Sequence, residues 1–293
     1  MSNKKDSLLS GIALFIVFLI VLKVFFIDAY NIPSSSMAPT LIRGDFVLSN
    51  KLVYGLTDPR RGDIAIFIFP HPEVFFGKKL VTTPIVRDFV NITFVKRIIG
   101  LPGDVISFNN GRLEINGKPL KYEYVGQSGN YTVYYEYIPR RGDYVKHLVQ
   151  YQTKGELNPL AKIGRYGVIV ADRNTQYLGI PREYCLKISP KSGKICYYNK
   201  DTNEVVCPTI CSEIKVPKGY YFVMGDNRDD SDDSRYWGFV RRDFILSTPF
   251  VIFFSGKVPE TSPQNATATT GIVQFFHAIL HPYWSRIGKP LIY

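Results

Sequence analysis

Three consecutive serines near the start of the chain have side chains that could attack a carbonyl carbon. They occupy positions 34–36, in the stretch NIPSSSMAPT. If this segment is extended after Pro33, alternation turns Ser34 and Ser36 to one side and Ser35 to the opposite side. A nucleophile and a second hydroxyl could then face one reacting carbonyl, but a serine needs a neighbouring base to be activated.

Lys96 has the surroundings of such a base. In FVKRIIG, residues 94–100, period-two alternation places Phe94, Lys96 and Ile98 on one face and Arg97 on the other. A lysine that apolar neighbours desolvate loses its charge near neutral pH and can act as a general base. The same pattern fits an edge strand whose lysine reaches the solvent, and the residues alone leave both interpretations open.

A third polar stretch, GDNRDDSDDSRYWGFV, covers residues 225–240 and has the composition of a loop. Trp237 and the strand-like runs on both sides predict that this loop is anchored against a core. An EF-hand is excluded because Ser231 stands where that pattern requires glycine and no spaced glutamate closes the loop. His277 and His281 lack the glutamate of an H-E-x-x-H motif. We therefore expect no metal and no cofactor.

The elements that must position these residues have the pattern of β-strands. Gly-Asp turn signals precede apolar runs in four stretches, RGDFVLS, RGDIAIFIF, PGDVISF and RGDYVKH. Asn116 and Gly117 lie between two short runs and predict a hairpin. No long helical periodicity follows residue 30. The sequence therefore predicts a mainly β, antiparallel fold.

Residues 1–28 predict a cytoplasmic N-terminus and a single transmembrane helix. Residues 8–27 are apolar apart from small residues and Lys23. As a helix, this segment is long enough to cross a hydrocarbon core of about 30 Å. Lys4 and Lys5 precede the span, which places the rest of the chain outside the cytoplasm. A cleaved signal peptide begins in the same way, but its apolar run is shorter and ends in an A-x-A site that is missing here.

The rest of the chain divides by composition. Residues 29–120 and 215–256 predict an antiparallel β-sheet core in two parts. Residues 121–214 are rich in Tyr, Lys, Gly and Asn and predict an inserted second β-rich subdomain. In the tail, residues 257–293, the apolar stretch GIVQFFHAIL is too short to span a membrane, so we expect it at a protein or membrane surface. The net charge of +11 favours anionic lipids over nucleic acid as a partner, because no zinc-finger or helix-turn-helix pattern is present.

All four cysteines lie in the insertion: Cys185, Cys196, Cys207 and Cys211. Their even number and their expected position outside the cytoplasm predict one or two disulfides, with the pairing left open. A zinc site is the alternative, although the C-x-x-C pair typical of such sites is missing.

Taken together and in this order, the motifs resemble those of type I signal peptidases, membrane-bound endopeptidases that remove signal peptides from exported proteins. The matching stretches are PSSSMAPTL, RGDIAIF, FVKRIIGLPGD and GDNRDDSDDSRYWGFV. The resemblance covers the anchor and the core, but not residues 121–214 or those after 256. Asp230 stands where the family pattern has asparagine, and Asp232 adds a charge, so the electrostatics of the loop differ from the pattern.

The resemblance implies a role for each matching residue. Ser36 would be the nucleophile and Lys96 its general base. Ser34 would join the backbone N–H of Ser36 in an oxyanion hole, and Ser231 would orient Lys96 by a hydrogen bond. A structural ion-pair cluster beside the site would consist of Asp233, Arg235 and Arg97.

The resemblance also implies the partners and the location. The substrates would be signal peptides of preproteins, cleaved after a small-x-small motif, with anionic membrane lipids and the export translocon nearby and no nucleic acid. The enzyme would be a single-pass protein of the bacterial cytoplasmic membrane with its catalytic domain on the periplasmic side. Sequons at Asn91, Asn130 and Asn265 favour a compartment without glycosylation, because a glycan at Asn91 would crowd Lys96.

Two other classes of protein fit part of the pattern. One is a different serine–lysine protease, such as the self-cleaving repressor-type proteins, which lack a membrane anchor and carry a DNA-binding domain. The other is a membrane-anchored β module without catalysis. Incubation with a preprotein separates them, because a binding module leaves the preprotein intact.

Overall fold

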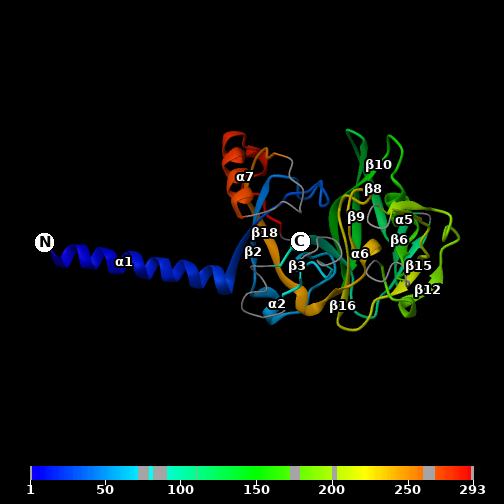
Figure 1. Cartoon of the computed structure of the whole chain (residues 1–293), viewed down its shortest axis with the longest axis horizontal. Helices are drawn as coiled ribbons and strands as arrows, with labels where there is room; N and C mark the ends of the chain where they lie inside the picture. The colour runs from blue at the N-terminus through cyan, green and yellow to red at the C-terminus, as the bar shows by residue number, and fades with distance from the viewer. Residues whose placement is uncertain are drawn as a thin grey trace.

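The computed structural model describes residues 2–71, 79–81, 91–109, 111–171, 179–199, 203–259 and 268–291. A helix, α1 (Ser2–Val21), projects from a body of β-strands (Figure 1). A π-helical turn, η1 (Leu22–Phe26), connects α1 to the first strand, β1 (Ile27–Asn31). Among the described residues, no helix combines the length and the apolar character needed to span a bilayer. The transmembrane anchor therefore stays a prediction.

A seven-stranded antiparallel sheet forms the centre of the body, in the order β1-β2-β18-β3-β4-β16-β17. The strands after β1 are β2 (Asp45–Asn50), β3 (Ile64–Ile68), β4 (Thr93–Gly100), β16 (Tyr220–Met224), β17 (Val240–Arg241) and β18 (Ile245–Ser255). All five residues of β3 are buried, as a continuous apolar run in the middle of a sheet predicts. Both expected core segments therefore contribute strands to one sheet.

A second sheet joins residues from before and within the expected insertion. Its order is β11-β15-β5-β6-β7, and β12 also pairs with β15. The strands are β5 (Val105–Asn109), β6 (Arg112–Ile115), β7 (Lys118–Pro119), β11 (Val168–Ile169), β12 (Cys185–Ile188) and β15 (Ile210–Lys215). The expected hairpin is present, with positive φ at Asn116 and Gly117. An isolated hairpin is barely stable in water, and here the pairing of β5 with β15 extends it into a larger sheet. Residues 105–119 therefore lie with the insertion and not in the central sheet.

The remaining strands belong to the insertion. A three-stranded sheet in the order β10-β9-β8 consists of β8 (Lys121–Ser128), β9 (Tyr131–Arg140) and β10 (Asp143–Gln152). A small ribbon pairs β13 (Tyr197–Asn199) with β14 (Glu204–Val206). The short helices of the body are α2 (Val53–Leu56), α5 (Pro159–Tyr166), α6 (Ser234–Trp237) and the 3₁₀ turns η2 (Arg182–Tyr184), η3 (Arg242–Phe244) and η5 (Trp284–Arg286). The fold is thus mainly β, as the sequence predicts.

The C-terminal tail contains a helix that the sequence analysis did not expect, α7 (Ala268–Leu280), which lies beside β2 and β18 (Figure 1). The ring centroid of Phe275 is 5.2 Å from that of Phe46 in β2 and 5.7 Å from that of Phe254 in β18. Asn31 Nδ2 donates to Gln274 Oε1 at 2.6 Å. One face of α7 therefore packs on the central sheet.

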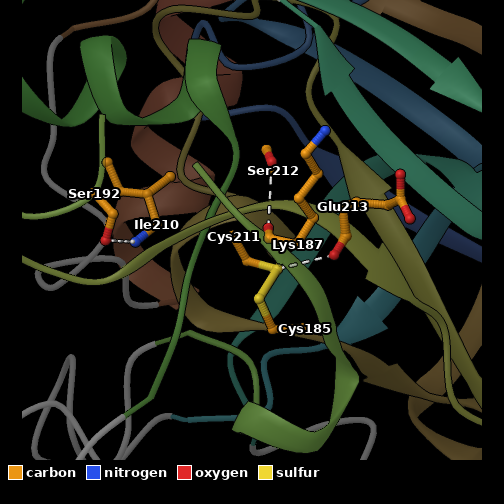
Figure 2. The surroundings of a disulfide bond; sticks show 7 residues. All are labelled: Cys185, Lys187, Ser192, Ile210, Cys211, Ser212 and Glu213. Atoms are coloured by element: carbon orange, nitrogen blue, oxygen red, sulfur yellow. Dashed lines mark hydrogen bonds between the residues drawn. A yellow bond between two sulfur atoms is a disulfide. The ribbon is translucent and has the colours of Figure 1, made fainter. Parts of the chain in front are cut away.

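Two disulfides form, Cys185–Cys211 and Cys196–Cys207. Figure 2 shows the first, which joins β12 to β15, with Ser212 Oγ donating to the backbone oxygen of Lys187 beside it. The disulfide prediction is confirmed, and the zinc alternative is wrong because none of the four cysteines is free.

Reduction of the disulfides should lower stability before it affects catalysis. The Cys185–Cys211 bond closes a sequence separation of 26 residues, for which chain-entropy arguments give about 3 kcal/mol of stabilisation. No cysteine lines the cleft that contains Ser36 and Lys96. We therefore expect dithiothreitol to lower the unfolding temperature while preprotein cleavage at moderate temperature persists. Loss of cleavage in reduced protein that is still folded, or four free thiols in protein from its native compartment, would contradict this.

Candidate active site

The structure brings the candidate nucleophile and the candidate base together. Lys96 Nζ on β4 lies 2.6 Å from Ser36 Oγ, in the segment that follows β1. Ser34 Oγ is 3.2 Å from Ser36 Oγ, so these two hydroxyls lie on one side, as alternation predicts. Ser35 Oγ instead donates to Asp230 Oδ2 at 2.6 Å.

Buried apolar residues hold the serine segment at both ends. Ile32 before the serines and Met37 and Leu41 after them are at most 3% exposed and pack in one hydrophobic cluster. The backbone N–H of Ile32 donates to the backbone oxygen of Asp45, and this hydrogen bond connects the segment to β2. The serines are therefore displayed from a backbone that is fixed on either side.

Ser36 and Lys96 face a cleft of about 520 Å³. One part of its wall is mainly apolar and includes Ile32, Phe94 and Val95. Another part is acidic and includes Asp229, Asp230 and Asp232, and a further part comes from the insertion, where Asn158, Leu160 and Ala161 at the start of α5 line the cleft. The contribution of α5 is a feature that the sequence analysis missed.

An ion pair holds α5 in this position. Arg165 in α5 donates to both carboxylate oxygens of Asp229, at 3.0 and 2.6 Å. Tyr236 in α6 donates from its hydroxyl to the backbone oxygen of Leu160 at 3.1 Å. Gly164 allows this close approach, because a Cβ at that position would lie 2.3 Å from the Tyr236 hydroxyl.

Lys96 is buried, with 3% of its surface exposed. Its Nζ lies 5.7 Å from the ring centroid of Phe94, and Ile98 on the same strand face is fully buried. Burial lowers the pKa of Lys96 to about 8, against the opposing charges of Asp233 and Asp232. The alternative interpretation, in which Lys96 reaches the solvent, is therefore wrong.

The pairing of β4 changes where the strand borders the cleft. Hydrogen bonding between β4 and β16 covers Arg97 to Gly100, and on the other side β3 pairs with residues 93–97. The described pairing with β16 thus ends at Arg97, next to the residues of β4 that line the cleft. A strand beside a cleft can align with an extended peptide.

Ser231 makes a different contact from the one expected, whereas the expected ion pair of Asp233 and Arg235 is present. Ser231 Oγ donates to Asp233 Oδ2 at 2.9 Å, and within the described chain Lys96 makes its side-chain hydrogen bond to Ser36 and not to Ser231. Arg235 donates from Nε and Nη2 to the two oxygens of Asp233, each at 2.8 Å. Burial would raise the pKa of Asp233, but the Arg235 charge holds it below its usual value. Asp233 therefore stays charged.

The expected pairing of Arg97 with Asp233 is wrong, because Arg97 pairs with Asp226. Arg97 Nε lies 2.8 Å from Asp226 Oδ1 and Nη2 lies 2.6 Å from Oδ2, and both side chains are fully buried. Register explains the change: β16 places Met224 opposite Arg97, so Asp226, two residues later, is within reach. Arg97 still points away from Lys96, as alternation predicts.

Asn227 contacts the nucleophile segment and was given no role in the sequence analysis. Its backbone N–H donates to the backbone oxygen of Ser36 at 3.0 Å, and its side-chain Nδ2 donates to the backbone oxygen of Ser35 at 3.2 Å. Asn227 is 1% exposed. The position of Asn227 directly after Asp226, in the stretch GDN, is the sequence feature that could have suggested such a contact.

Comparison with known proteins assigns this chain first to a class and then to a family. A sequence profile described as "Signal peptidase, peptidase S26" matches residues 6–254, which defines the class as a peptidase. The chain belongs to the signal peptidase S26 family. A signal peptidase I of Aquifex aeolicus is 39% identical over 296 residues, covering 94% of this chain and 96% of that protein.

A more distant sequence relative has the same description, and one solved structure shows a weaker similarity. A signal peptidase I of Buchnera aphidicola subsp. Schizaphis graminum is 31% identical over 279 residues, covering 89% of this chain and 79% of the relative. A crystal structure of a signal peptidase I from Enterococcus faecalis covers 66% of this chain and 97% of that chain, with 23% identity and a TM-score of 0.26. The function of the chain is that of a signal peptidase I.

Proposed function

We propose that the chain removes N-terminal signal peptides with Ser36 as nucleophile and Lys96 as general base. The observation that supports this most is the 2.6 Å separation of Lys96 Nζ and Ser36 Oγ at the wall of a cleft. The neutral amine of Lys96 takes the proton of Ser36 as Oγ attacks the carbonyl carbon of the scissile bond. The backbone N–H of Ser36 and the hydroxyl of Ser34 donate to the oxyanion that forms.

The same lysine completes the reaction. The tetrahedral intermediate collapses, the C–N bond breaks, and the ammonium of Lys96 gives its proton to the departing amine. This leaves an ester between the signal peptide and Ser36. Lys96, now neutral, takes a proton from water, which attacks the ester and releases the signal peptide and the free serine hydroxyl.

The substrate binds in this proposal as an extended strand in the cleft, beside the residues of β4 that line it. Alternation of an extended peptide sends every second side chain toward the enzyme, so two residues of a small-x-small motif reach the apolar wall near Ile32 and Val95. Bulky residues at these two positions are excluded by that wall. The carbonyl between motif and mature chain then lies at Ser36.

The enzyme acts at the bacterial cytoplasmic membrane, with residues 8–27 as a single anchor and the body on the periplasmic side. Two disulfides support an oxidising compartment for the body. Exposed apolar side chains of α7 and the turn after it, Phe276, Leu280 and Trp284, suit contact with membrane lipids. Anionic lipids, the export translocon and the signal peptides of preproteins are the partners in this proposal.

A preprotein cleavage assay tests the proposal. Full-length enzyme in detergent is incubated with a preprotein that carries Ala-x-Ala before the mature sequence, and the new N-terminus is determined. Cleavage directly after the motif is the expected result, and a matched preprotein with Phe in place of the last Ala should stay intact. An intact Ala-x-Ala preprotein would instead identify a β module without catalysis. Cleavage of the enzyme by itself alone would favour the repressor-type alternative.

The two serines before Ser36 offer a matched pair of variants. Ser34→Ala removes a hydroxyl 3.2 Å from Ser36 Oγ and should lower kcat by about a hundredfold, the usual loss for one oxyanion donor. Ser35→Ala removes a hydroxyl that points to Asp230 and should change kcat by less than about threefold, because exposed hydrogen bonds contribute little. Steady-state kinetics with the Ala-x-Ala preprotein measures both. Equal losses in the two variants would contradict the assignment of Ser34.

A further inference from the structure

A cluster of buried charges lies behind the nucleophile segment, and none of its members lines the cleft. Strands β4, β9 and β10 and the loop after β16 contribute its charged and titratable side chains: Arg97, Glu136, His147, Asp226 and Arg228. Each of them is at most 2% exposed. The reaction proposed above uses none of these five side chains.

The cluster is electrically balanced when its histidine is neutral. Arg97 pairs with Asp226, and Arg228 pairs with Glu136 through both of its terminal nitrogens. These two ion pairs contribute two positive and two negative charges. Protonation of His147 therefore adds a positive charge that no further carboxylate of the cluster compensates.

His147 lies between the two carboxylates. Its Nε2 is 3.2 Å from Glu136 Oε2 and 3.6 Å from Asp226 Oδ1. Nε2 thus faces one carboxylate from each of the two ion pairs. The imidazole therefore lies where the two ion pairs of the cluster meet.

Residues 226–228 connect His147 to Ser36. On one side, the backbone N–H of Asn227 donates to the backbone oxygen of Ser36 at 3.0 Å. On the other side, the backbone of Gln150 in β10 makes two hydrogen bonds to the segment. Its N–H donates to the backbone oxygen of Asp226 at 2.9 Å, and its carbonyl oxygen accepts from the backbone N–H of Arg228 at 3.0 Å. One short segment is thus bonded both to the nucleophile and to the strand that carries His147.

We infer that His147 is a positioning residue: its neutral imidazole, between Glu136 and Asp226, holds residues 226–228 and, through Asn227, the main chain of Ser36. The inference rests on the proposed function of Ser36 as nucleophile. Protonation of the ring unbalances the cluster and displaces this segment, so cleavage becomes slower for a reason that is separate from the state of Lys96.

The surroundings of His147 decide the pH at which this happens. Burial and the positive charge of Arg97 lower the pKa of His147 from 6.5, while Asp226 and Glu136 act in the opposite direction. Among the residues that the structure describes, the titratable and charged side chains that interact within the cluster include Arg97 of β4, Tyr122 of β8, Glu136 of β9, Tyr151 of β10, and Asp226 and Arg228 of the loop. The imidazole is thus neutral over the range in which Lys96 titrates and gains its proton only in more acidic solution.

His147→Gln tests the inference, because glutamine keeps a polar side chain that cannot titrate. In wild-type enzyme, log kcat/KM for the Ala-x-Ala preprotein should fall with a slope of about one below the pKa of Lys96 and steepen toward two in more acidic solution, as a second proton binds to His147. The variant should keep a slope of about one throughout. At pH ~9 its kcat should be about fivefold lower with an unchanged KM, because the position of Ser36 changes and the substrate-binding cleft does not.

His71→Gln is the matched control. His71 is a partly buried histidine outside the cluster, and its Nε2 lies 3.0 Å from the backbone oxygen of Trp237. This variant should have the wild-type profile, including the steep acidic part. A wild-type slope of one at every acidic pH at which the enzyme stays folded, or a steep slope that survives His147→Gln, overturns the inference.

Thermal unfolding separates a positioning role from a merely structural one. A histidine whose pKa is lowered by folding binds more protons in the unfolded state, so its contribution to stability is lost as pH falls below about 6.5. Relative to His147→Gln, wild-type enzyme should therefore lose a few degrees of Tm between pH ~7.5 and ~5.5. If Tm behaves in this way but both enzymes keep a slope of one, His147 is only structural. If wild-type enzyme cleaves no preprotein at any pH, the proposed function fails instead.

Discussion

Ser36→Ala and Lys96→Ala are each expected to abolish preprotein cleavage while the protein remains folded. The nucleophile and its base act as one unit, so removal of either should cost at least about a thousandfold in kcat. Lys96 is the one lysine or arginine among the described residues that line the cleft, so no second amine replaces it. Time courses with the Ala-x-Ala preprotein and excess enzyme measure residual activity over this range.

Folding controls make the result specific. Ser36→Ala removes one hydroxyl from a segment that Ile32, Met37 and Leu41 hold by burial, and Lys96→Ala removes a group whose charge is costly to bury. Both variants should therefore unfold cooperatively near the wild-type temperature. Wild-type cleavage rates in either folded variant would show that the pair is not the catalytic one.

The positions of the strands were predictable because turn chemistry is local. Gly44 and Gly62, before β2 and β3, have φ values of 90° and 88°, which favour glycine over other residues. A Cβ at Gly44 would also lie 2.0 Å from the backbone oxygen of Gly256. The Gly-Asp signals therefore correspond to backbone requirements that a single sequence reveals.

The partners of the strands were less predictable. β5 pairs with β15, for example Ser107 with Glu213, although about a hundred residues separate them in the sequence. Alternation specifies which face of a strand is buried, but it does not identify the distant strand that completes the sheet. The α7 helix was missed for a related reason: its short apolar run fits several structures until Phe275 is seen against β2 and β18.

At the site, alternation correctly predicted side-chain directions, and the family resemblance suggested which residues meet. Ser34 and Ser36 share one side, and Arg97 points away from Lys96. The partner of Arg97 was not predictable, because several aspartates in the 225–240 loop carry the same charge and only the register of β16 selects Asp226. The α5 wall of the cleft comes from the part of the chain that the resemblance does not cover.

The pH dependence of cleavage should report the titration of Lys96. Only the neutral amine can accept the proton of Ser36, so the rate follows the neutral fraction and rises with pH. Burial lowers the pKa of Lys96 to about 8, so about a tenth of the enzyme is active at pH ~7 and the midpoint lies near pH ~8. A lysine with an ordinary pKa of about 10.4 would be neutral in less than about one molecule in a thousand at pH ~7.

Variants at Lys96 and at its acidic neighbour test this explanation. Lys96→Arg should be inactive at every pH from about 6 to 10, because a guanidinium stays protonated throughout this range. Lys96→His would retain at most a trace of activity. Asp232 acts to raise the pKa of Lys96, so Asp232→Asn should move the midpoint of the profile to lower pH. The explanation fails if Lys96→Arg cleaves normally, or if the wild-type midpoint persists after Lys96 is removed, because the proton that controls the rate would then belong to another group.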